Sequence, residues 1–365
     1  MTNRLHRLHD DAGQSPWLDN LQRGWLRDGT LQRYVDRGVR GVTSNPSIFA
    51  KAMQAAIYDD QLHAVLAGGA GVEDAYWELV IDDIVDALEV LRPLHDASGG
   101  ADGFVSVEVD PRLAHDTDGT VAAARDLWRR IDRPNLLVKV PATAAGLPAI
   151  ERLIGEGISV NVTLIFSQQR YHDVMEAYLA GLETARTAGR PLGSIASVAS
   201  FFVSRVDGEV DKQLEQLGTA EAMALRGRAA VANAKVAFAA FRERFSGDRW
   251  AGLAAAGARV QRPLWASTST KNPDYPDTLY VDTLIGPDTV NTMPDATLEA
   301  FADHGTIART VDADSDAARL ALDQLARLGI KMDEVTDKLE TDGVAAFIAS
   351  FDEVLATLAG RARSS

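Results

Sequence analysis

Short runs of apolar and β-branched residues alternate with longer amphipathic stretches along the chain. This alternation is typical of βα units built around a parallel sheet. The pattern predicts eight strands, at residues 15–19, 39–45, 104–110, 136–141, 159–164, 194–200, 263–267 and 279–283. It also predicts helices, from apolar positions that recur with helical spacing, at 72–91, 120–131, 167–185, 220–245 and 342–358.

Eight strand-helix units over 365 residues favour one α/β domain, a single (β/α)8 TIM barrel with additional helices that include a C-terminal helix. A doubly wound sheet accounts less well for that number of units. No linker rich in proline and serine and no repeat of fixed period divides the chain. We therefore expect an N-terminal tail at residues 1–14 and one barrel domain, with its C-terminal helices, at residues 15–365.

Three neighbouring predicted strands carry polar residues near their C-terminal ends. Strands of a parallel barrel are buried on both faces, so they should be almost entirely apolar, and polar positions are informative. Because side chains alternate along a strand, Glu108 and Lys139 are expected to point toward the barrel axis, while Asn161 and Thr163 share one face of their strand. Barrel enzymes build their sites at this end of the strands.

Lys139 stands among leucine and valine in the predicted strand 136–141. Burial disfavours its charged ammonium form, and the neutral amine is a nucleophile. The chain contains seven lysines and thirty arginines, yet a lysine occupies this position, and only lysine can lose its proton. The pattern alone supports two interpretations equally, a reactive amine or a structural ion pair between Lys139 and Glu108.

The overall composition narrows the classes of function. A formal net charge of -15 argues against a nucleic-acid partner, because phosphate would be repelled. The absence of cysteine excludes disulfides and thiolate catalysis and fits a reducing cytosol. The seven histidines lack the spacing of a metal site. Because there is no apolar signal segment and no stretch of membrane-spanning length, we expect a cytoplasmic protein without a membrane partner.

Two segments have the composition of a phosphate site. Residues 265–272 offer hydroxyls, backbone N–H groups and the cation of Lys271 after the seventh predicted strand, where barrels commonly bind phosphate. Arg205 lies in the first turn of the helix that follows the sixth strand, and a helix N-terminus attracts anions. Each segment also fits an ordinary role, the first as a turn or helix cap and the second as a surface arginine.

Six segments follow one another in the order found in a known enzyme family. They are GVTSNPSIF at 41–49, VSVEVD at 105–110, NLLVKVP at 135–141, NVTLIF at 161–166, SFFVSR at 200–205 and GPDTVNTMP at 286–294. Together they resemble transaldolase, from about residue 17 into the last helix. The resemblance is closest to the longer bacterial branch found in actinobacteria and cyanobacteria.

The resemblance implies a barrel that needs no metal and no organic cofactor. It also implies transfer of a dihydroxyacetone unit from sedoheptulose 7-phosphate or fructose 6-phosphate to glyceraldehyde 3-phosphate or erythrose 4-phosphate. The transfer would use a lysine Schiff base and belong to the non-oxidative pentose phosphate pathway. Sugar phosphates would be its partners, and we expect a monomer or a homodimer.

The resemblance also implies roles for individual residues. Lys139 matches the Schiff-base lysine, and Asp19 matches the carboxylate that shuttles a proton at the cleaved carbon. Glu108 and Thr163 match a pair that holds a catalytic water. The other matches are to positions that contact the dihydroxyacetone part, Asn45, Asn161 and Ser200, and to the phosphate site, Arg205 and Ser267.

The expected phosphate site departs from the pattern of other branches, which place an arginine two residues after the position of Ser267. Ser269 stands there in this chain, and a cation arrives only at Lys271. We therefore expect Lys271 to contact the phosphate. It keeps the positive charge of the arginine but loses the bidentate geometry.

Two other functions remain open. An aldolase that cleaves fructose 6-phosphate and releases free dihydroxyacetone would use the same lysine chemistry. A non-catalytic barrel that binds sugar phosphates would keep Lys139 and Glu108 as a structural pair. A two-substrate transfer assay distinguishes the aldolase, and borohydride trapping on Lys139 distinguishes the binding protein.

Overall fold

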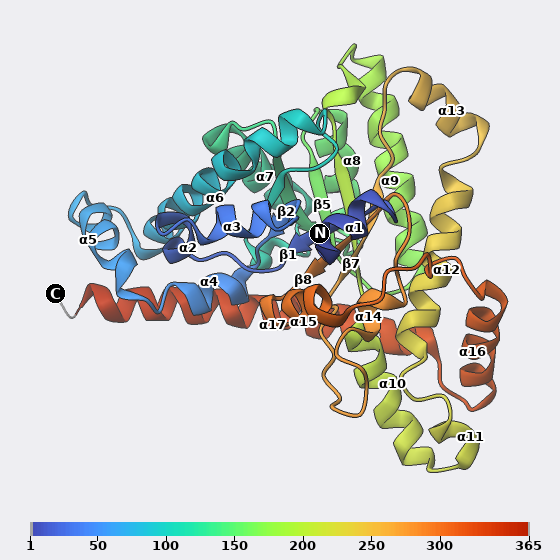
Figure 1. Cartoon of the computed structure of the whole chain (residues 1–365). Helices are drawn as coiled ribbons and strands as arrows, with labels where there is room; N and C mark the ends of the chain where they lie inside the picture. Colours follow the sequence, from blue (N-terminus) through green and yellow to red (C-terminus); the bar gives the residue numbers. More distant parts are fainter. Residues whose placement is uncertain (1–2, 364–365) are drawn as a thin grey trace.

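The computed structural model describes residues 3–363, which form a closed barrel of eight parallel strands surrounded by helices (Figure 1). Each strand pairs with its neighbours in sequence, and the eighth closes the ring against the first. The strands are β1 (Gln14–Leu18), β2 (Gly41–Thr43), β3 (Phe104–Glu108), β4 (Leu136–Pro141), β5 (Val160–Ile165), β6 (Ser197–Phe202), β7 (Arg262–Ala266) and β8 (Thr289–Met293). The expected (β/α)8 barrel is confirmed.

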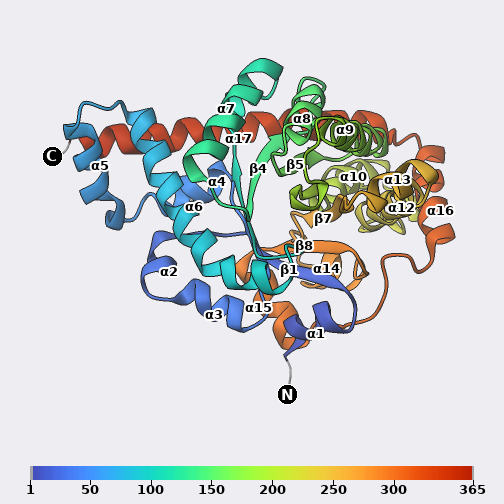
Figure 2. The same ribbon diagram turned by 90° about the horizontal axis from the view of Figure 1, so that it is seen from above.

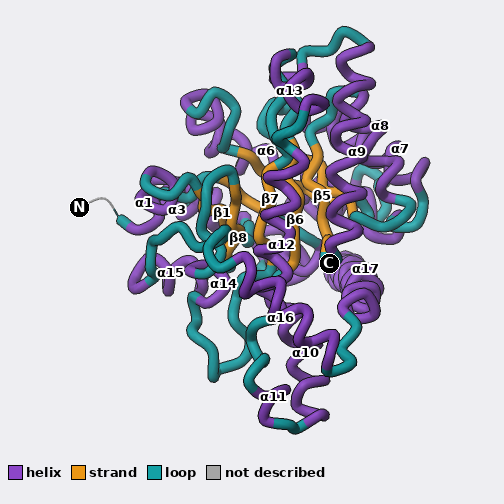
Figure 3. The backbone as a smooth tube through the Cα atoms, turned by 90° about the vertical axis from the view of Figure 1, so that its right-hand side faces the viewer, coloured by secondary structure: helices purple, strands orange, loops and turns teal. Residues whose placement is uncertain are grey.

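Helices fill the connections and enclose the strands (Figure 3). Those before β6 are α1 (Arg4–Asp10), α2 (Arg23–Arg27), α3 (Thr30–Asp36), α4 (Pro46–Ala52), α5 (Asp59–Ala67), α6 (Val72–Ala97), α7 (Thr117–Ile131), α8 (Gly146–Gly155) and α9 (Gln168–Thr187). Those after β6 are α10 (Ser204–Leu217), α11 (Ala220–Met223), α12 (Ala229–Arg244), α13 (Asp248–Ala255), α14 (Leu279–Asp282), α15 (Asp295–His304), α16 (Ser315–Arg327) and α17 (Met332–Ala362). Three 3-10 turns complete the set, η1 (Ala56–Tyr58), η2 (Pro111–Leu113) and η3 (Leu192–Ser194).

The prediction of the last strand was wrong. Residues 279–283, expected as a strand, form the short helix α14, and the eighth strand is β8, ten residues further on. A short apolar run does not distinguish helix from strand. β8 escaped detection because polar residues interrupt it. Two of them, Thr289 and Asn291, are fully buried, and Asn291 accepts a hydrogen bond from Thr268 Oγ1 at 2.9 Å.

Two further segments differ from the expectation. The helix expected at 220–245 is two helices, α11 and α12, separated by a turn in which Gly227 has a φ of 70°, a value that suits glycine. The segment expected as a tail contains α1, whose Leu5 and Leu8 are fully buried, and it supplies Gln14 to β1.

The last helix, α17, is the longest in the described residues and runs beside α4 (Figures 1 and 2). By length and composition alone it could cross a membrane, so the expectation that no stretch reaches that length was wrong. Acidic residues such as Asp352 and Glu353 interrupt its apolar run in the sequence. In the structure its apolar side packs on α4, α6 and α10, with Phe347, Phe351 and Val354 buried.

The pairing register brings together the polar residues of three strands. Glu108 of β3 lies beside Lys139 of β4, and Lys139 lies beside Asn161 of β5. Residues in register on neighbouring strands point to the same face of a sheet. The barrel therefore presents a carboxylate, an amine and an amide side by side in its interior.

Gly41, at the start of β2, is expected to tolerate no side chain. A Cβ at this position would lie 2.4 Å from the indole ring of Trp17, which is fully buried. Gly41→Ala should lower the free energy of unfolding by about 1–3 kcal/mol, because the barrel is overpacked there. Chemical denaturation measures the change. Gly24→Ala in α2, where nothing lies within 4 Å, is the matched control and should be neutral or stabilising. Equal stability of both variants would contradict the expected clash.

Candidate active site

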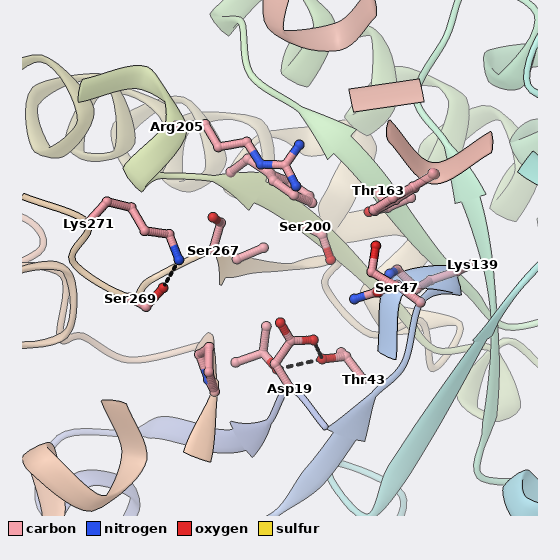
Figure 4. Close-up of a pocket in the computed structure, with 16 residues that line it drawn as sticks. Asp19, Thr43, Ser47, Lys139, Thr163, Ser200, Arg205, Ser267, Ser269 and Lys271 are labelled. Atoms are coloured by element: carbon pink, nitrogen blue, oxygen red, sulfur yellow. Dashed lines mark hydrogen bonds between the residues drawn. The ribbon is translucent and has the colours of Figure 1, made fainter. Parts of the chain in front are cut away.

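A cavity opens at the C-terminal ends of the strands (Figure 4). Its walls come from many strands at once, because Asp19 follows β1, Lys139 belongs to β4, Thr163 to β5 and Ser200 to β6. Phe347 of α17 closes one side. The cavity thus lies where a barrel enzyme is expected to place its chemistry.

Lys139 is buried, and its amine faces the cavity. Nζ donates hydrogen bonds to Glu108 Oε2 at 3.1 Å and to the carbonyl oxygen of Ser44 at 3.0 Å. The ring centroid of Phe347 lies 5.7 Å from Nζ, within range of a cation–π contact. Burial raises the pKa of Glu108, and the positive charge of Lys139 opposes this rise. The raised pKa makes this carboxyl group a better proton acceptor than an exposed glutamate.

Asp19 lies across the cavity from Lys139 (Figure 4). Its Oδ1 accepts a hydrogen bond from Thr43 Oγ1 at 2.7 Å, and Thr43 Oγ1 lies 2.6 Å from Thr292 Oγ1. Because Thr43 donates to the carboxylate, Thr292 is the donor in the second contact. Burial raises the pKa of Asp19, while the charge of Lys139 and the hydrogen bond from Thr43 hold it down. The arrangement suits a proton acceptor.

Asn161 lies beneath the cavity surface and connects two serines. Its Nδ2 donates to Ser106 Oγ at 3.0 Å, and its Oδ1 accepts from Ser200 Oγ at 2.7 Å. All three side chains are buried. The amide therefore holds the Ser200 hydroxyl in place within the cavity wall.

Thr163 lies next to an irregularity in β5. The register against β6 shifts between Val162 and Ile165, and Leu164 takes a left-handed φ of 60°, which is costly for a bulky residue. Such strain concentrates at functional sites. Thr163 Oγ1 and Glu108 Oε1 are both buried and form no hydrogen bond with other groups in residues 3–363. Buried polar oxygens normally have a partner, so these two atoms are available to a water molecule or a substrate group.

The cations lie at the far end of the cavity from Lys139, with Ser267 between them (Figure 4). Arg205 lies in the first turn of α10, and its Cζ is 5.2 Å from the ring centroid of Phe202. Burial lowers the pKa of Arg205, but a guanidinium keeps its charge in proteins. Ser267 has a φ of 55°, and Lys271 Nζ donates to Ser269 Oγ at 2.6 Å. This end of the cavity presents two positive charges and several hydroxyls to an anion.

The residues singled out in the sequence lie together. All of them line the cavity except Glu108 and Asn161, which lie directly behind it and bond to Lys139 and Ser200. Asn45 caps α4 by accepting from the Ile48 N–H at 3.0 Å. The structure thus gathers into one site residues that are up to 252 positions apart, from Asp19 to Lys271.

Other residues that line the cavity were not predicted from the sequence. Thr43 and Thr292 belong to segments 41–49 and 286–294, so the motifs contained them without indicating their contact with Asp19 or with each other. Ser47 also lies in the first of these segments, and its Oγ is 2.7 Å from Ser350 Oγ of α17. Phe347 could not be predicted from the sequence, because no local pattern indicates that this position of a long helix contacts a lysine of the barrel.

Comparison with known proteins agrees with the geometry. The chain matches, over residues 16–358, the family described as Transaldolase/Fructose-6-phosphate aldolase. It is 56% identical over 358 residues to "Transaldolase" of Thermobifida fusca (strain YX), covering 97% of each chain. It is 54% identical over 348 residues to "Transaldolase" of Mycobacterium tuberculosis (strain ATCC 25618 / H37Rv), covering 94% of this chain and 93% of the relative. It is 54% identical over 353 residues to "Transaldolase" of Mycolicibacterium smegmatis (strain ATCC 700084 / mc(2)155), covering 96% and 95%.

The match to the family spans most of the barrel and includes the strands that carry Lys139, Glu108 and Asn161. The relatives share more than half of their residues with this chain and are covered almost completely. The chain therefore belongs to the transaldolase/fructose-6-phosphate aldolase family.

Proposed function

We propose that the protein is a transaldolase, a transferase that moves a dihydroxyacetone unit between sugar phosphates through a Schiff base on Lys139. The observation that carries this proposal is the position of the amine. Lys139 is buried, bonded to a carboxyl group of raised pKa, and open to a polar cavity that has cations at its other end. Names of relatives that are more than 50% identical point to the same reaction.

In the first half of the proposed reaction, Glu108 takes a proton from the Lys139 ammonium across 3.1 Å. The free amine attacks the ketone carbon of fructose 6-phosphate or sedoheptulose 7-phosphate and forms a carbinolamine. Glu108, now protonated, returns its proton to the leaving hydroxyl, and water departs as the iminium forms. The unpaired oxygens Glu108 Oε1 and Thr163 Oγ1 support a role for this pair in holding that water.

In the second half, Asp19 removes the proton from the hydroxyl at the carbon to be cleaved. The carbon–carbon bond breaks, its electron pair moves toward the iminium nitrogen, and an aldose phosphate leaves. The dihydroxyacetone unit stays on Lys139 as an enamine. An incoming aldose phosphate, glyceraldehyde 3-phosphate or erythrose 4-phosphate, then reacts by the reverse sequence, and hydrolysis frees the amine.

The rest of the cavity supports the division of the substrate into two parts. We assign Asn45, Asn161 and Ser200 to the dihydroxyacetone part, because Asn45 and Ser200 line the cavity and Asn161 orients Ser200. We assign Arg205, Ser267 and Lys271 to the phosphate, because they supply cations and a hydroxyl at the end remote from Lys139.

A two-substrate assay tests the proposal. Fructose 6-phosphate with erythrose 4-phosphate should give sedoheptulose 7-phosphate and glyceraldehyde 3-phosphate in equal amounts. Release of free dihydroxyacetone without need of an acceptor would instead indicate an aldolase, the other activity in the family description. Binding of fructose 6-phosphate without any product would indicate a non-catalytic barrel.

Loss of the guanidinium at position 205 should weaken substrate binding. Arg205→Gln is expected to raise the KM for fructose 6-phosphate by about 10- to 100-fold, because a charge-assisted contact with the phosphate is removed. Trapping of unphosphorylated dihydroxyacetone on Lys139 by borohydride should proceed as before. Arg319→Gln, at an exposed arginine of α16, is the control. An unchanged KM in Arg205→Gln would remove this residue from the phosphate site.

The substrates of this protein are sugar phosphates, as for the family. We further propose that it acts in the cytoplasm as a monomer or a homodimer, apart from membranes, and that residues 3–363 form a single barrel domain. Its lack of cysteine supports the cytoplasmic assignment, because it fits a reducing compartment. Size-exclusion chromatography with light scattering tests the oligomeric state.

A further inference from the structure

The loop that carries Lys271 lies between β7 and α14 and is partly exposed. Several of its hydrogen bonds stay within the loop. Lys271 donates to Ser269, Thr270 donates to Pro276 O, and Asp274 N–H donates to Asn272. The two ends of the loop are anchored, Thr268 to Asn291 of β8 and Asp277 to His304 of α15, whereas these three bonds only shape the part between them.

One hydrogen bond joins residues 269–276 to a distant part of the described chain. Tyr275 Oη donates to Asp211 Oδ2 at 2.6 Å. Asp211 belongs to α10, and its other oxygen accepts the Gly227 N–H at 3.0 Å, so the carboxylate is itself held. Burial and the nearby carboxylate raise the pKa of Tyr275, which keeps its hydroxyl protonated as a donor.

The tyrosine ring is also fixed by packing. A Cβ at Gly227 would lie 2.9 Å from Tyr275 Cζ, so the ring rests directly on the backbone of the turn between α11 and α12. Gly227 has a φ of 70°. The hydroxyl of Tyr275 therefore contacts α10, and its ring contacts the turn whose Gly227 is bonded to α10.

The helix that receives Tyr275 is the helix that carries Arg205. Arg205 lies in the first turn of α10, and Asp211 lies six residues further along the same helix. Asp207, between them, accepts a hydrogen bond from Tyr280 Oη at 2.8 Å, just beyond the loop. Arg205 and the loop of Lys271 are thus connected through α10 and the bond from Tyr275 to Asp211.

We propose that Tyr275 is a positioning residue, which holds the loop so that the Lys271 ammonium faces a substrate phosphate together with Arg205. The inference rests on the proposed function and extends it to the recognition of the phosphate dianion. Tyr275 acts through Lys271, since it does not line the cavity itself. Without the Asp211 bond the loop samples other positions, and only some of them place Lys271 at the phosphate.

The test is a double-mutant cycle with Tyr275→Phe and Lys271→Ala. Tyr275→Phe keeps the ring on Gly227 and removes only the hydroxyl. We expect about a tenfold rise in the KM for fructose 6-phosphate and in the Kd for inorganic phosphate measured by calorimetry. The kcat and the borohydride adduct formed from unphosphorylated dihydroxyacetone should not change. In the Lys271→Ala background, Tyr275→Phe should have no further effect.

Tyr178→Phe is the matched control, because it removes a tyrosine hydroxyl that donates to Arg259 O at 2.8 Å, away from the cavity. It should leave KM and phosphate binding unchanged. The inference is overturned if Tyr275→Phe alters neither constant, if it acts equally with and without Lys271, or if the unaltered protein binds no inorganic phosphate. If phosphate binding follows the expected cycle while the unaltered protein transfers no dihydroxyacetone, the positioning role stands and the proposed function fails.

Discussion

Lys139→Met is expected to abolish the transfer of dihydroxyacetone, with a fall in kcat of at least about 10⁴-fold. The substituted side chain fills the same space in β4 but has no amine to form the iminium, so the covalent pathway is lost. In the unaltered protein, incubation with fructose 6-phosphate and borohydride should leave a reduced adduct on Lys139. Peptide mass spectrometry locates it, and the adduct should be absent from the variant.

The control for this experiment is Lys235→Met. Lys235 is a partly buried lysine of α12 that donates to Ala313 O at 2.9 Å and lies outside the cavity. That variant should retain both activity and the adduct. Removal of Lys139 also leaves Glu108 without its partner, so thermal unfolding must show that the variant is folded. A folded, fully active Lys139→Met protein, or an adduct on another lysine, would refute the proposed chemistry.

Asp19→Asn should stop the reaction at a later point, after the Schiff base has formed. We expect kcat to fall by about 10²- to 10⁴-fold, because an amide cannot take the hydroxyl proton on which cleavage depends. Borohydride should then trap the intact six-carbon ketose phosphate on Lys139 instead of the three-carbon unit. The mass of the trapped adduct therefore distinguishes a role in cleavage from a role in Schiff-base formation.

The pH dependence of the unaltered protein offers a second measurement on Asp19. The carboxyl group acts as a base only when it is ionised, so kcat should fall as the pH is lowered through its pKa. Burial raises that pKa, so this acid limb should lie above the usual range for aspartate. Thr43→Val removes a hydrogen bond that favours the ionised form, which should move the limb to still higher pH.

Three results would contradict the role of Asp19. The first is full activity of Asp19→Asn, and the second is accumulation of the three-carbon adduct in that variant at the normal rate. The third is an acid limb that does not move in Thr43→Val, which would assign the limb to another group. Glu108 is the nearest alternative, since burial raises its pKa as well.

Much of this protein follows from local patterns in its sequence. The alternation of apolar runs with amphipathic stretches determined the barrel, because strands and helices differ in the period at which side chains return to one face. The same period placed Glu108 and Lys139 in the barrel interior, as observed. Pattern alone could not choose between a reactive amine and an ion pair at Lys139, and Asp19 was expected only from the resemblance to transaldolase.

Only the tertiary structure decided the features that depend on contacts between distant segments. β8 could not be predicted as a strand, because its buried polar residues are satisfied by distant segments, as Asn291 is by Thr268. Phe347 comes to Lys139 from a helix more than 200 positions away, and Thr43 reaches Asp19 across neighbouring strands. The Tyr275 bond to Asp211 joins a loop to a helix in the same way. Sequence periodicity reports which face of an element is buried, whereas the identity of the group packed against that face is set by how the whole chain closes around the barrel.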